Sequence, residues 1–430
     1  MPTPDRATLG QAIAARRGWA VETLSAWVRF ASVLGSEGPA QEFIAEVFAT
    51  LGLEVRREPL DMERLRALPG YGPPAWPCDG KANVIGIHDP GSNAKRSLVF
   101  NGHVDVVSPE PARLWSAPPF EPLVRTVDGE TWLHGRGAGD MKGGVVCYLW
   151  ALAALRDLGL EPASRVVCQS VVEEECTGNG ALSACANGHL GDACIDLEPT
   201  DEGLVRAQIG VLWFQVRVLG RTEHAKGTQS GVNAIEKTYA LIRALRELEE
   251  SLNCRERIPL AYQHVPHPIN LNVGIVRGGD WASTVAGECE SHFRIALFPG
   301  EKLETRMAQV REAIEAAAAR DSWLCANPPE IEFTGFRAEG CIFDTESDLA
   351  HALQSAHSAW RGEPACCQDS KATTDTRFFN LYYHTPATCY GPKAANIHGA
   401  DERVCLDSMQ RVAEVLSSFV ADWCGVRVRG

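Results

Sequence analysis

The stretch "FNGHVDVVSP" (residues 100–109) closes an apolar run and carries His103 and Asp105 one residue apart. Alternate residues of an extended chain point to the same side, so both side chains are expected to face one cavity. The apolar runs "NVIGI" (83–87) and "SLVF" (97–100) that precede them are typical of buried strands. The stretch therefore predicts a histidine and a carboxylate at the tip of a strand, where ligands of parallel α/β sheets bind.

The first 205 residues alternate strand-like and helical segments. The spacing of apolar residues predicts helices at 39–51 and 143–159, and strand-like runs lie at 165–172 and 193–197. This alternation predicts an α/β domain with a central, mostly parallel sheet.

The pattern changes near residue 206. "GVLWFQVRVLG" (210–220) is an alternating strand that places Trp213 and Gln215 on the face opposite to Leu212 and Phe214. A helix, a strand pair, a second helix and a short strand follow, and the order β-α-β-β-α-β is typical of a ferredoxin-like sandwich. Near residue 337 the α/β pattern returns and ends in a predicted helix at 407–422. We therefore predict a catalytic domain of residues 1–205 and 338–430, and an inserted α+β domain of residues 206–337.

Composition excludes several classes of partner. A chain of 430 residues is expected to form two domains, and its net charge of −14 argues against binding to nucleic acid or to anionic membranes. We find no stretch long enough for a signal peptide or a membrane span. The fifteen cysteines are scattered, and many lie inside apolar runs, so reduced thiols and a cytoplasmic location are expected.

Further metal-ligand candidates follow His103 along the chain. They are Asp140 in "GRGAGDMKGG", Glu173, Glu174 and Glu175 in "VVEEECTGNG", Glu198 in "DLEPT" and His398 in "NIHGADE". Each follows a strand-like run, so these groups are expected to converge at one edge of the sheet. Imidazole and carboxylate ligands without thiolates suit Zn²⁺, Co²⁺ or Mn²⁺ in a hydrolytic site. Two histidines and three carboxylates suit two metal ions if one carboxylate bridges them.

Each of these signals has a simpler explanation when it stands alone. A single histidine is more often a surface or core residue than a ligand, and three consecutive glutamates are usually a solvated charge run. The glycine-rich stretch around Asp140 could cradle a phosphate, but it lacks the third glycine of a dinucleotide fingerprint and a well-placed Walker lysine. The occurrence of all the candidates at expected strand ends favours the metal site.

Taken together, the motifs resemble those of the dinuclear-zinc amidohydrolases and peptidases that include acetylornithine deacetylase, succinyl-diaminopimelate desuccinylase, aminoacylase and glutamate carboxypeptidase. The resemblance rests on "NGHVDVV", "GRGAGDMKGG", "EEECTGNGA", "LEPT", "EHAKGTQSGVNAIEK" and "IHGADE", and it covers nearly the whole chain. It implies a zinc-peptidase-like catalytic domain with two Zn²⁺ ions per subunit, for which Co²⁺ or Mn²⁺ could substitute.

The resemblance also implies individual roles. His103 and Glu198 would hold one zinc ion, Glu175 and His398 the other, and Asp140 would bridge them. Asp105 would orient His103, and Glu174 would be the general base that activates a metal-bridging water. The downstream glycines Gly178 and Gly180 set this register, and a shifted register, with Glu173 as base and Glu174 as ligand, remains open.

Substrate contacts and assembly follow from the same resemblance. The inserted domain would form a homodimer, and His224 from the neighbouring subunit would stabilise the oxyanion. Asn272 matches, more weakly, a position that also reaches the partner's site. Arg377 would clamp a substrate carboxylate, unless it forms a structural salt bridge, and Thr374 and Gly391 lie where substrate contacts are plausible.

Four features depart from the family pattern. Cys176 and Thr177 stand where glycine is common. Glu173 stands where aspartate is frequent, and Glu223 adds a negative charge beside His224, which would tune the substrate or weaken the role of that histidine. The segment "ALPGYGPPAWPCDG" (67–80) is rich in proline and glycine, and it either walls the substrate cleft or simply connects two elements.

The sequence thus predicts a metal-dependent hydrolase that removes an acyl group from an N-acyl amino acid or a similar small amide bearing a carboxylate. A dipeptidase or carboxypeptidase on the same metal centre, and a hydrolase of aromatic amides or amines, are alternatives. A non-catalytic metal-dependent dimer that binds a small ligand is a further alternative, but such a protein would not need Glu174 as a base.

Overall fold

The computed structural model describes residues 4–429. Its largest sheet has six strands, in the order β1 (Glu54–Pro59), β2 (Ala82–His88), β7 (Val166–Ser170), β3 (Leu98–Asn101), β8 (Cys194–Asp196) and β17 (Ala387–Cys389). The last four of these strands run parallel to one another, and β1 and β2 add antiparallel pairs at one edge. The predicted α/β class is confirmed, with a parallel centre inside a mixed sheet.

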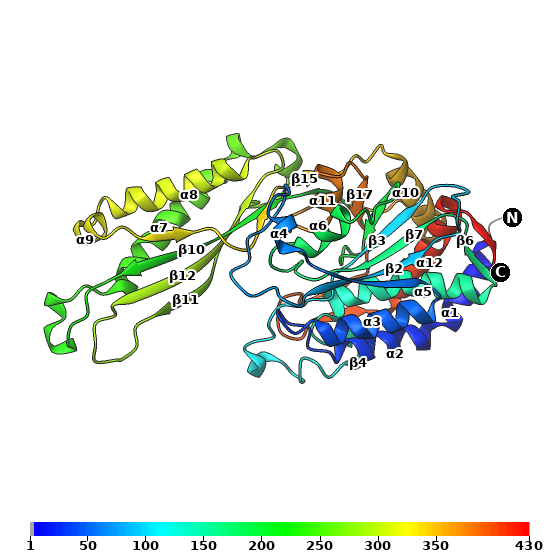
Figure 1. Ribbon diagram of the computed structural model, residues 1–430, viewed down its shortest axis with the longest axis horizontal. Helices are drawn as coiled ribbons and strands as arrows, with labels where there is room; N and C mark the ends of the chain where they lie inside the picture. Colours follow the sequence, from blue (N-terminus) through cyan, green and yellow to red (C-terminus); the bar gives the residue numbers. More distant parts are fainter. Residues whose placement is uncertain (1–3, 430) are drawn as a thin grey trace.

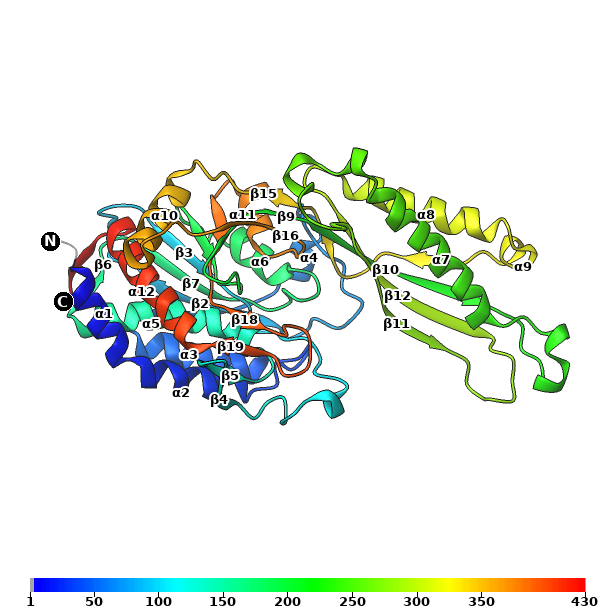
Figure 2. The same ribbon diagram turned by 180° about the vertical axis from the view of Figure 1, so that it is seen from behind.

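Helices cover both faces of this sheet (Figures 1 and 2). On one face lie α1 (Arg6–Ala15), α2 (Arg17–Val28), α3 (Gly38–Thr50), α5 (Gly143–Asp157) and α12 (Leu406–Trp423). On the other lie α4 (Met62–Leu65), α6 (Asn179–Ala186) and α11 (Thr376–Leu381), while α10 (Asp348–Arg361) packs against α12. Residues 143–155 of α5 are all buried, because this apolar helix lies between the sheet and α12.

Smaller sheets complete the larger part of the molecule. One has the order β18 (Ala394–Ala395), β19 (Arg403–Cys405), β5 (Glu130–His134) and β4 (Leu123–Val127). Another joins β15 (Cys341–Ile342), β9 (Leu204–Gln208) and β16 (Cys367–Ser370), and β6 (Leu160–Pro162) pairs with β20 (Val426–Val428).

The smaller part of the molecule is a separate sheet with two helices on one face (Figure 1). The strand order is β11 (Leu271–Gly278), β12 (Glu288–Leu297), β10 (Gly210–Leu219) and β13 (Glu330–Glu332), with β14 (Arg337–Ala338) also paired to β10. The helices are α7 (Ala234–Leu252) and α8 (Leu303–Ala318), and the short α9 (Ser322–Ala326) follows α8. This order is the predicted ferredoxin-like arrangement.

Two hydrophobic cores correspond to the two parts. One consists of residues between Leu9 and Leu204 and between Phe343 and Val426, and the other of residues between Ala207 and Phe333. β9 lies at the predicted boundary near residue 206 and pairs with β15 and β16 of the larger part. The exact domain boundaries stay a prediction.

The two parts lie side by side, and both chain termini are at the far end of the larger part (Figure 1). Within residues 4–429, none of the helices combines the length and apolar character that crossing a bilayer requires.

Candidate metal centre

Three adjacent parallel strands carry the first candidate ligands. His103 and Asp105 follow β3, Glu174 and Glu175 follow β7, and Glu198 follows β8. Because β7, β3 and β8 are neighbours with the same direction, their carboxyl ends meet at one edge of the sheet. The shared direction of these three strands therefore explains why the residues that follow them lie close together.

Asp140 and His398 lie next to these residues but do not follow strands of the central sheet. Asp140 lies in the turn before α5, and His398 lies in the loop between the antiparallel strands β18 and β19. Both residues follow a strand, as expected, but these strands, β5 and β18, belong to the smaller antiparallel sheet and not to the central one.

One buried ion pair fixes both of these loops. Glu402 accepts the main-chain N–H groups of Gly139 (2.9 Å) and Asp140 (3.0 Å) and pairs with Arg136. Arg136 also donates to the main-chain oxygen of Gly399 at 3.1 Å, next to His398. The turn that holds Asp140 and the loop that holds His398 are thus tied to each other.

The carboxylate of Asp140 lies between the two histidines. Its Oδ1 is 3.1 Å from Nε2 of His103, and its Oδ2 is 3.3 Å from Nε2 of His398. On the far sides, Nε2 of His103 is 3.7 Å from Glu198, and Nε2 of His398 is 3.0 Å from Glu175. This order of groups is compatible with the arrangement that the family resemblance implies, in which Asp140 bridges two metal ions.

The chemistry of this donor set fits metal ions. Nδ1 of His103 donates to the main-chain oxygen of Asp105 at 2.8 Å, so that Nε2 is left to act as a ligand. Burial raises the pKa of Glu174 and of Glu198 well above the usual value, and neighbouring carboxylates add to the effect. Side chains of His103, Asp140 and Glu175, and of His103, Glu174 and Glu198, lie close enough to share an ion. Several buried carboxylates this close together are stable in their ionised form only when a cation compensates their charge.

The three consecutive glutamates have different surroundings. Glu173 is buried and paired with Lys81, with further hydrogen bonds from Trp76 and Thr177, so it faces away from the cluster. Glu175 contacts His398. Oε1 of Glu174 is buried and has no hydrogen-bond partner among residues 4–429, and its Oε2 is 4.0 Å from Nε2 of His103. The shifted register, with Glu173 as the base, is not compatible with this placement, whereas Glu174 is free to accept a proton.

Asp105 has a different contact from the one expected. Its main-chain oxygen, not its carboxylate, accepts the hydrogen bond from Nδ1 of His103, and the nearer carboxylate oxygen is 3.8 Å away. The carboxylate instead accepts the N–H groups of Glu174 (3.3 Å) and Glu175 (3.0 Å).

Two residues expected near the active site lie on the smaller part. His224 is exposed, and its Nδ1 accepts the N–H of Lys226 at 3.0 Å. The carboxylate of Glu223 accepts the N–H of His224 at 2.8 Å, which shapes the same turn. His224 does not line the cavity beside the metal cluster, and its role through a second subunit stays a prediction. Asn272 does line that cavity within one chain.

The three substrate contacts predicted on the larger part stay predictions, and the structure gives each of these residues a contact within the protein. Arg377 is buried, and its two Nη atoms donate to the main-chain oxygens of Thr374 and Thr177, each at 3.0 Å. The hydroxyl of Thr374 is buried and donates to Gln208 at 2.9 Å. A Cβ atom at Gly391 would lie 2.2 Å from the main-chain oxygen of Glu198, so this glycine allows close packing behind a ligand candidate.

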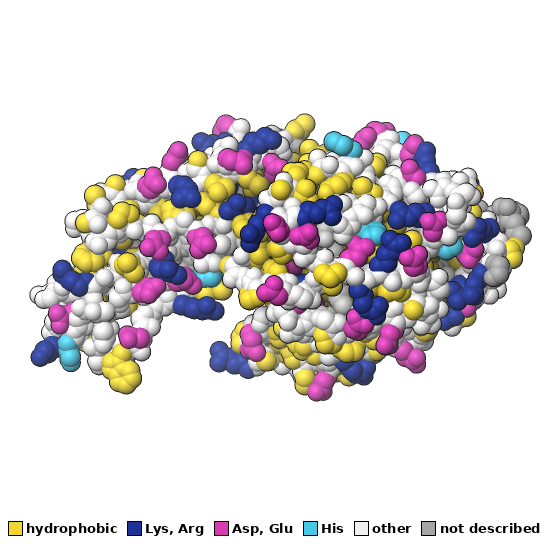
Figure 3. Space-filling view, viewed as in Figure 1, with side chains coloured by type: hydrophobic (Ala, Val, Ile, Leu, Met, Phe, Trp, Pro, Cys, Tyr) yellow, Lys and Arg dark blue, Asp and Glu magenta, His cyan; other side chains and the backbone are white. Residues whose placement is uncertain are grey.

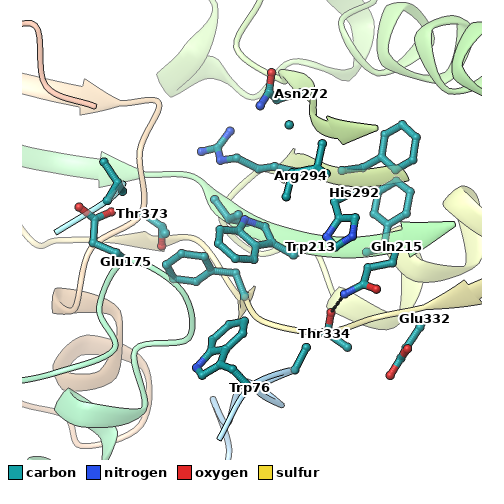
Figure 4. Close-up of a pocket in the computed structure, with 18 of the residues that line it drawn as sticks. Trp76, Glu175, Trp213, Gln215, Asn272, His292, Arg294, Glu332, Thr334 and Thr373 are labelled. Carbon is teal, nitrogen blue, oxygen red and sulfur yellow. Dashed lines mark hydrogen bonds between the residues drawn. The ribbon is translucent and has the colours of Figure 1, made fainter. Parts of the chain in front are cut away.

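A cavity of about 880 Å³ opens beside the metal cluster and extends between the two parts (Figures 3 and 4). The larger part contributes Trp76, Glu174, Glu175, Thr373 and His398, and the smaller part contributes Trp213, Gln215, Asn272, His292, Arg294 and Phe336. Thr373, not Thr374, faces this space, and its hydroxyl has no partner among residues 4–429. The alternation of β10 predicted that Trp213 and Gln215 share one face of the strand. It did not predict that this face lines a cavity against the larger part.

The sequence analysis named Asn272 but not its cross-strand neighbour Arg294. The two residues lie on β11 and β12, respectively, and Trp213 on β10 is the next residue in the same row. Burial lowers the pKa of Arg294. Within residues 4–429 its guanidinium forms no ion pair, and its one hydrogen bond is a long one, 3.4 Å to the main-chain oxygen of Lys371. The side chain of Asn272 has no hydrogen bond in the same part of the chain.

Comparisons with known proteins agree with this geometry. The chain is 29% identical over 366 residues to the N-formyl-4-amino-5-aminomethyl-2-methylpyrimidine deformylase of Bacillus subtilis (strain 168), covering 80% of this chain and 84% of that protein. It is 28% identical over 353 residues to the acetylornithine deacetylase of Vibrio atlanticus (strain LGP32), covering 80% and 85%.

Two solved structures share the whole fold. Human carnosine dipeptidase 1 matches with a TM-score of 0.76 and 16% identity, over 98% of this chain and all of that one. The dipeptidase Dug1p of Saccharomyces cerevisiae matches with a TM-score of 0.78 and 14% identity, over 98% of each chain. The model of peptidase family M20/M25/M40 matches residues 99–422, which include all five metal-ligand candidates. The chain therefore belongs to peptidase family M20/M25/M40.

Proposed function

We propose that this protein is a dinuclear-zinc amidohydrolase that removes a short acyl group from the nitrogen of a small amide. The observation that carries the proposal is the position of Asp140 between His103 and His398, with the unpaired carboxylate of Glu174 beside them. The deformylase and deacetylase relatives, which align over about four fifths of the chain, support the same class of reaction.

The proposed roles follow the contacts. His103 and Glu198 would hold one Zn²⁺ ion, Glu175 and His398 the other, and Asp140 would bridge them. When bound, these ions would polarise the amide carbonyl and acidify a water molecule. Glu174 takes a proton from the attacking water and passes it to the leaving amine, and its raised pKa suits a group that must do both.

The cavity favours a substrate with a negative group. Arg294 is a half-buried guanidinium without an acidic partner among residues 4–429, and Asn272 offers an amide beside it. A carboxylate is the group that this pair would bind best. We therefore propose Arg294 and Asn272, in place of Arg377, as the carboxylate-binding residues. A dipeptidase activity would use the same pocket.

We further propose a homodimer formed through residues 206–337, in which His224 of each copy would donate a hydrogen bond to the developing oxyanion in the other. The exposed position of His224, outside its own cavity, supports this arrangement. A cytoplasmic location is proposed from the thiols of the cysteines, ten of which lie buried in the two cores or near them.

The function is tested by a substrate screen. Zinc-loaded protein is incubated with N-formyl, N-acetyl and N-succinyl amino acids, with N-formylated aminomethylpyrimidine and with dipeptides, and the released amine is measured. We expect turnover of an N-acyl amide that is abolished by a chelator and restored by Zn²⁺ or Co²⁺. Hydrolysis of dipeptides alone would favour a peptidase, and no amine release from any of them would contradict the proposal.

A further inference from the structure

The segment 67–80 forms part of the cavity wall. Ala75 and Trp76 line the cavity, and Trp76 lies on the opposite side from Asn272 (Figure 4). The main-chain N–H and C=O of Gly72 form reciprocal hydrogen bonds with the side chain of Asn179, at 3.1 and 2.8 Å. The main-chain oxygen of Pro73 accepts the N–H of Gly335 at 2.7 Å. The segment is therefore fixed to both parts of the molecule, and it is more than a connection.

Trp76 is attached directly to the turn that carries the proposed base. Its indole Nε1 donates to Oε1 of Glu173 at 2.8 Å. The same carboxylate accepts the hydroxyl of Thr177 at 2.9 Å and pairs with Lys81, which also pairs with Glu37 at 2.9 Å. The side chain of Glu173 is fully buried. An indole that lines the cavity is thus held by a buried ion-pair network.

Glu173 also shapes the turn around Glu174. Its main-chain oxygen accepts the N–H groups of Thr177 (2.9 Å) and Gly178 (2.6 Å), and its φ of +70° lies in the left-handed region. One residue therefore sets both the position of the Trp76 ring, through its side chain, and the course of the turn next to Glu174, through its backbone. Glu173 therefore connects the Trp76 ring directly to the turn that carries the base.

Two further aromatic side chains line the cavity that Trp76 lines. Trp213 and Phe336 line the same cavity and pack edge to face, with ring centroids 5.2 Å apart and planes at 81°. Aromatic side chains bind flat rings through stacked and edge-to-face contacts, and they lose little conformational entropy when they are already held in place. A saturated ring of the same size lacks the flat face that these contacts require.

We propose that Trp76 is a specificity residue for a flat aromatic ring on the substrate, and that Glu173 is the positioning residue that holds Trp76 in register with Glu174. This rests on the proposed amidohydrolase function and names the class of its substrate. The substrate would carry its ring against Trp76, Trp213 and Phe336 while its amide faces the metal cluster.

The experiment compares two substrates that differ only in the ring. These are N-acyl-phenylalanine and N-acyl-cyclohexylalanine, both with the acyl group that the wild-type zinc protein removes fastest. We expect kcat/KM to favour the phenyl substrate by about tenfold. Trp76→Ala should bring the ratio close to one, mainly through KM, and Trp76→Phe should give an intermediate ratio. Trp19→Ala removes a half-buried indole on α2, away from the cavity, and should leave the ratio unchanged.

The role of Glu173 is tested by two variants. Glu173→Gln keeps the length and one acceptor oxygen for Trp76, whereas Glu173→Asp is one methylene too short to reach Trp76 and Thr177 together. Both should lower the melting temperature, because Lys81 loses part of its pairing. Only Glu173→Asp should lose the ring preference, and Glu173→Gln should retain it.

Three outcomes separate the proposals. Equal kcat/KM for the two rings in the wild type, or a preference that survives Trp76→Ala, overturns the assignment of Trp76 while leaving the amidohydrolase function in place. A ring ratio that is unchanged in Glu173→Asp, despite a lower melting temperature, overturns the positioning role. Failure to hydrolyse any amide in the wider screen overturns the proposed function itself.

Discussion

The carboxylate of Asp105 accepts the main-chain N–H of Glu175 at 3.0 Å. The second carboxylate oxygen accepts the N–H of Glu174 at 3.3 Å, so one side chain holds the turn that carries both the proposed base and a ligand candidate. His103 is oriented by the main-chain oxygen of the same residue. The carboxylate of Asp105 thus links the end of β3 to the turn after β7, and its main-chain oxygen orients His103 on its own segment.

Asp105→Asn separates these two contacts. The variant retains the main-chain oxygen that orients His103, but it replaces one acceptor oxygen with an NH₂ group that faces an N–H donor. We expect kcat to fall about 10- to 100-fold while the zinc content stays near that of the wild type. Turnover and metal content are measured on the same preparation. Loss of one zinc ion per subunit would instead mean that the carboxylate acts mainly through His103.

Glu174→Gln tests the base. The glutamine has nearly the same shape but cannot take a proton from water, so we expect kcat to fall by about 10²- to 10⁴-fold. Both metal ions should remain, because Asp140, Glu175, Glu198 and the two histidines are untouched. Metal analysis after dialysis distinguishes the roles: a variant that loses an ion together with its activity would identify Glu174 as a ligand.

Removal of the metal should make stability depend on pH. The folded-state pKa values of Glu174 and Glu198 are raised, so the folded metal-free protein binds more protons than the unfolded chain above about pH 4.5. The free energy of unfolding of the metal-free protein therefore falls as the pH rises above about 4.5. We expect the melting temperature of the chelator-treated protein to drop as the pH is raised above about 5.

The matched control for this pH effect is the double variant Glu174→Gln, Glu198→Gln. Its metal-free melting temperature should change less across the same pH range, because two of the buried acids no longer ionise. An equal slope in the wild type and the double variant would show that other groups cause the dependence.

Sequence reasoning worked where local pattern decides the position. His103, Glu174 and Glu198 follow buried strands, and the direction of those strands brings them together. The carboxylate-binding role of Arg377 stays a prediction, because the side chain matches a family motif while its two Nη atoms donate to main-chain oxygens within the larger part. Sequence reasoning did not identify Arg294 as a cavity residue. The outward face of β12 lines a cavity only because the larger part lies opposite it. Contacts between two separate sheets are not encoded in the periodicity of either one.

Arg294→Met and Arg377→Met should have different effects. Arg294→Met removes a charged donor from the cavity, so we expect KM for N-acetyl-phenylalanine to rise about 10- to 100-fold with a smaller change in kcat. N-acetyl-phenethylamine, which lacks the carboxylate, should be affected little. Arg377→Met leaves the main-chain oxygen of Thr177 without its donor, while that of Thr374 keeps the one from Gln208, and the variant should lower the melting temperature instead. A selective loss of the carboxylate substrate in Arg377→Met would return the role to that residue.

A mixture of two inactive variants tests whether the active site is shared between subunits. His224→Ala removes the proposed oxyanion donor, and Glu174→Gln removes the base, so each homodimer should have little activity. In a mixed dimer, the subunit with His224→Ala keeps its own Glu174 and receives His224 from its partner, so one of the two sites is complete. Random exchange in an equal mixture should then recover about a quarter of the wild-type activity.

The formation of mixed dimers is measured independently with two affinity tags. The activity of the mixture can be interpreted only when mixed dimers have been isolated. Mixed dimers without activity would place the oxyanion donor within the same chain, and a protein that stays monomeric would remove the route by which His224 reaches the site.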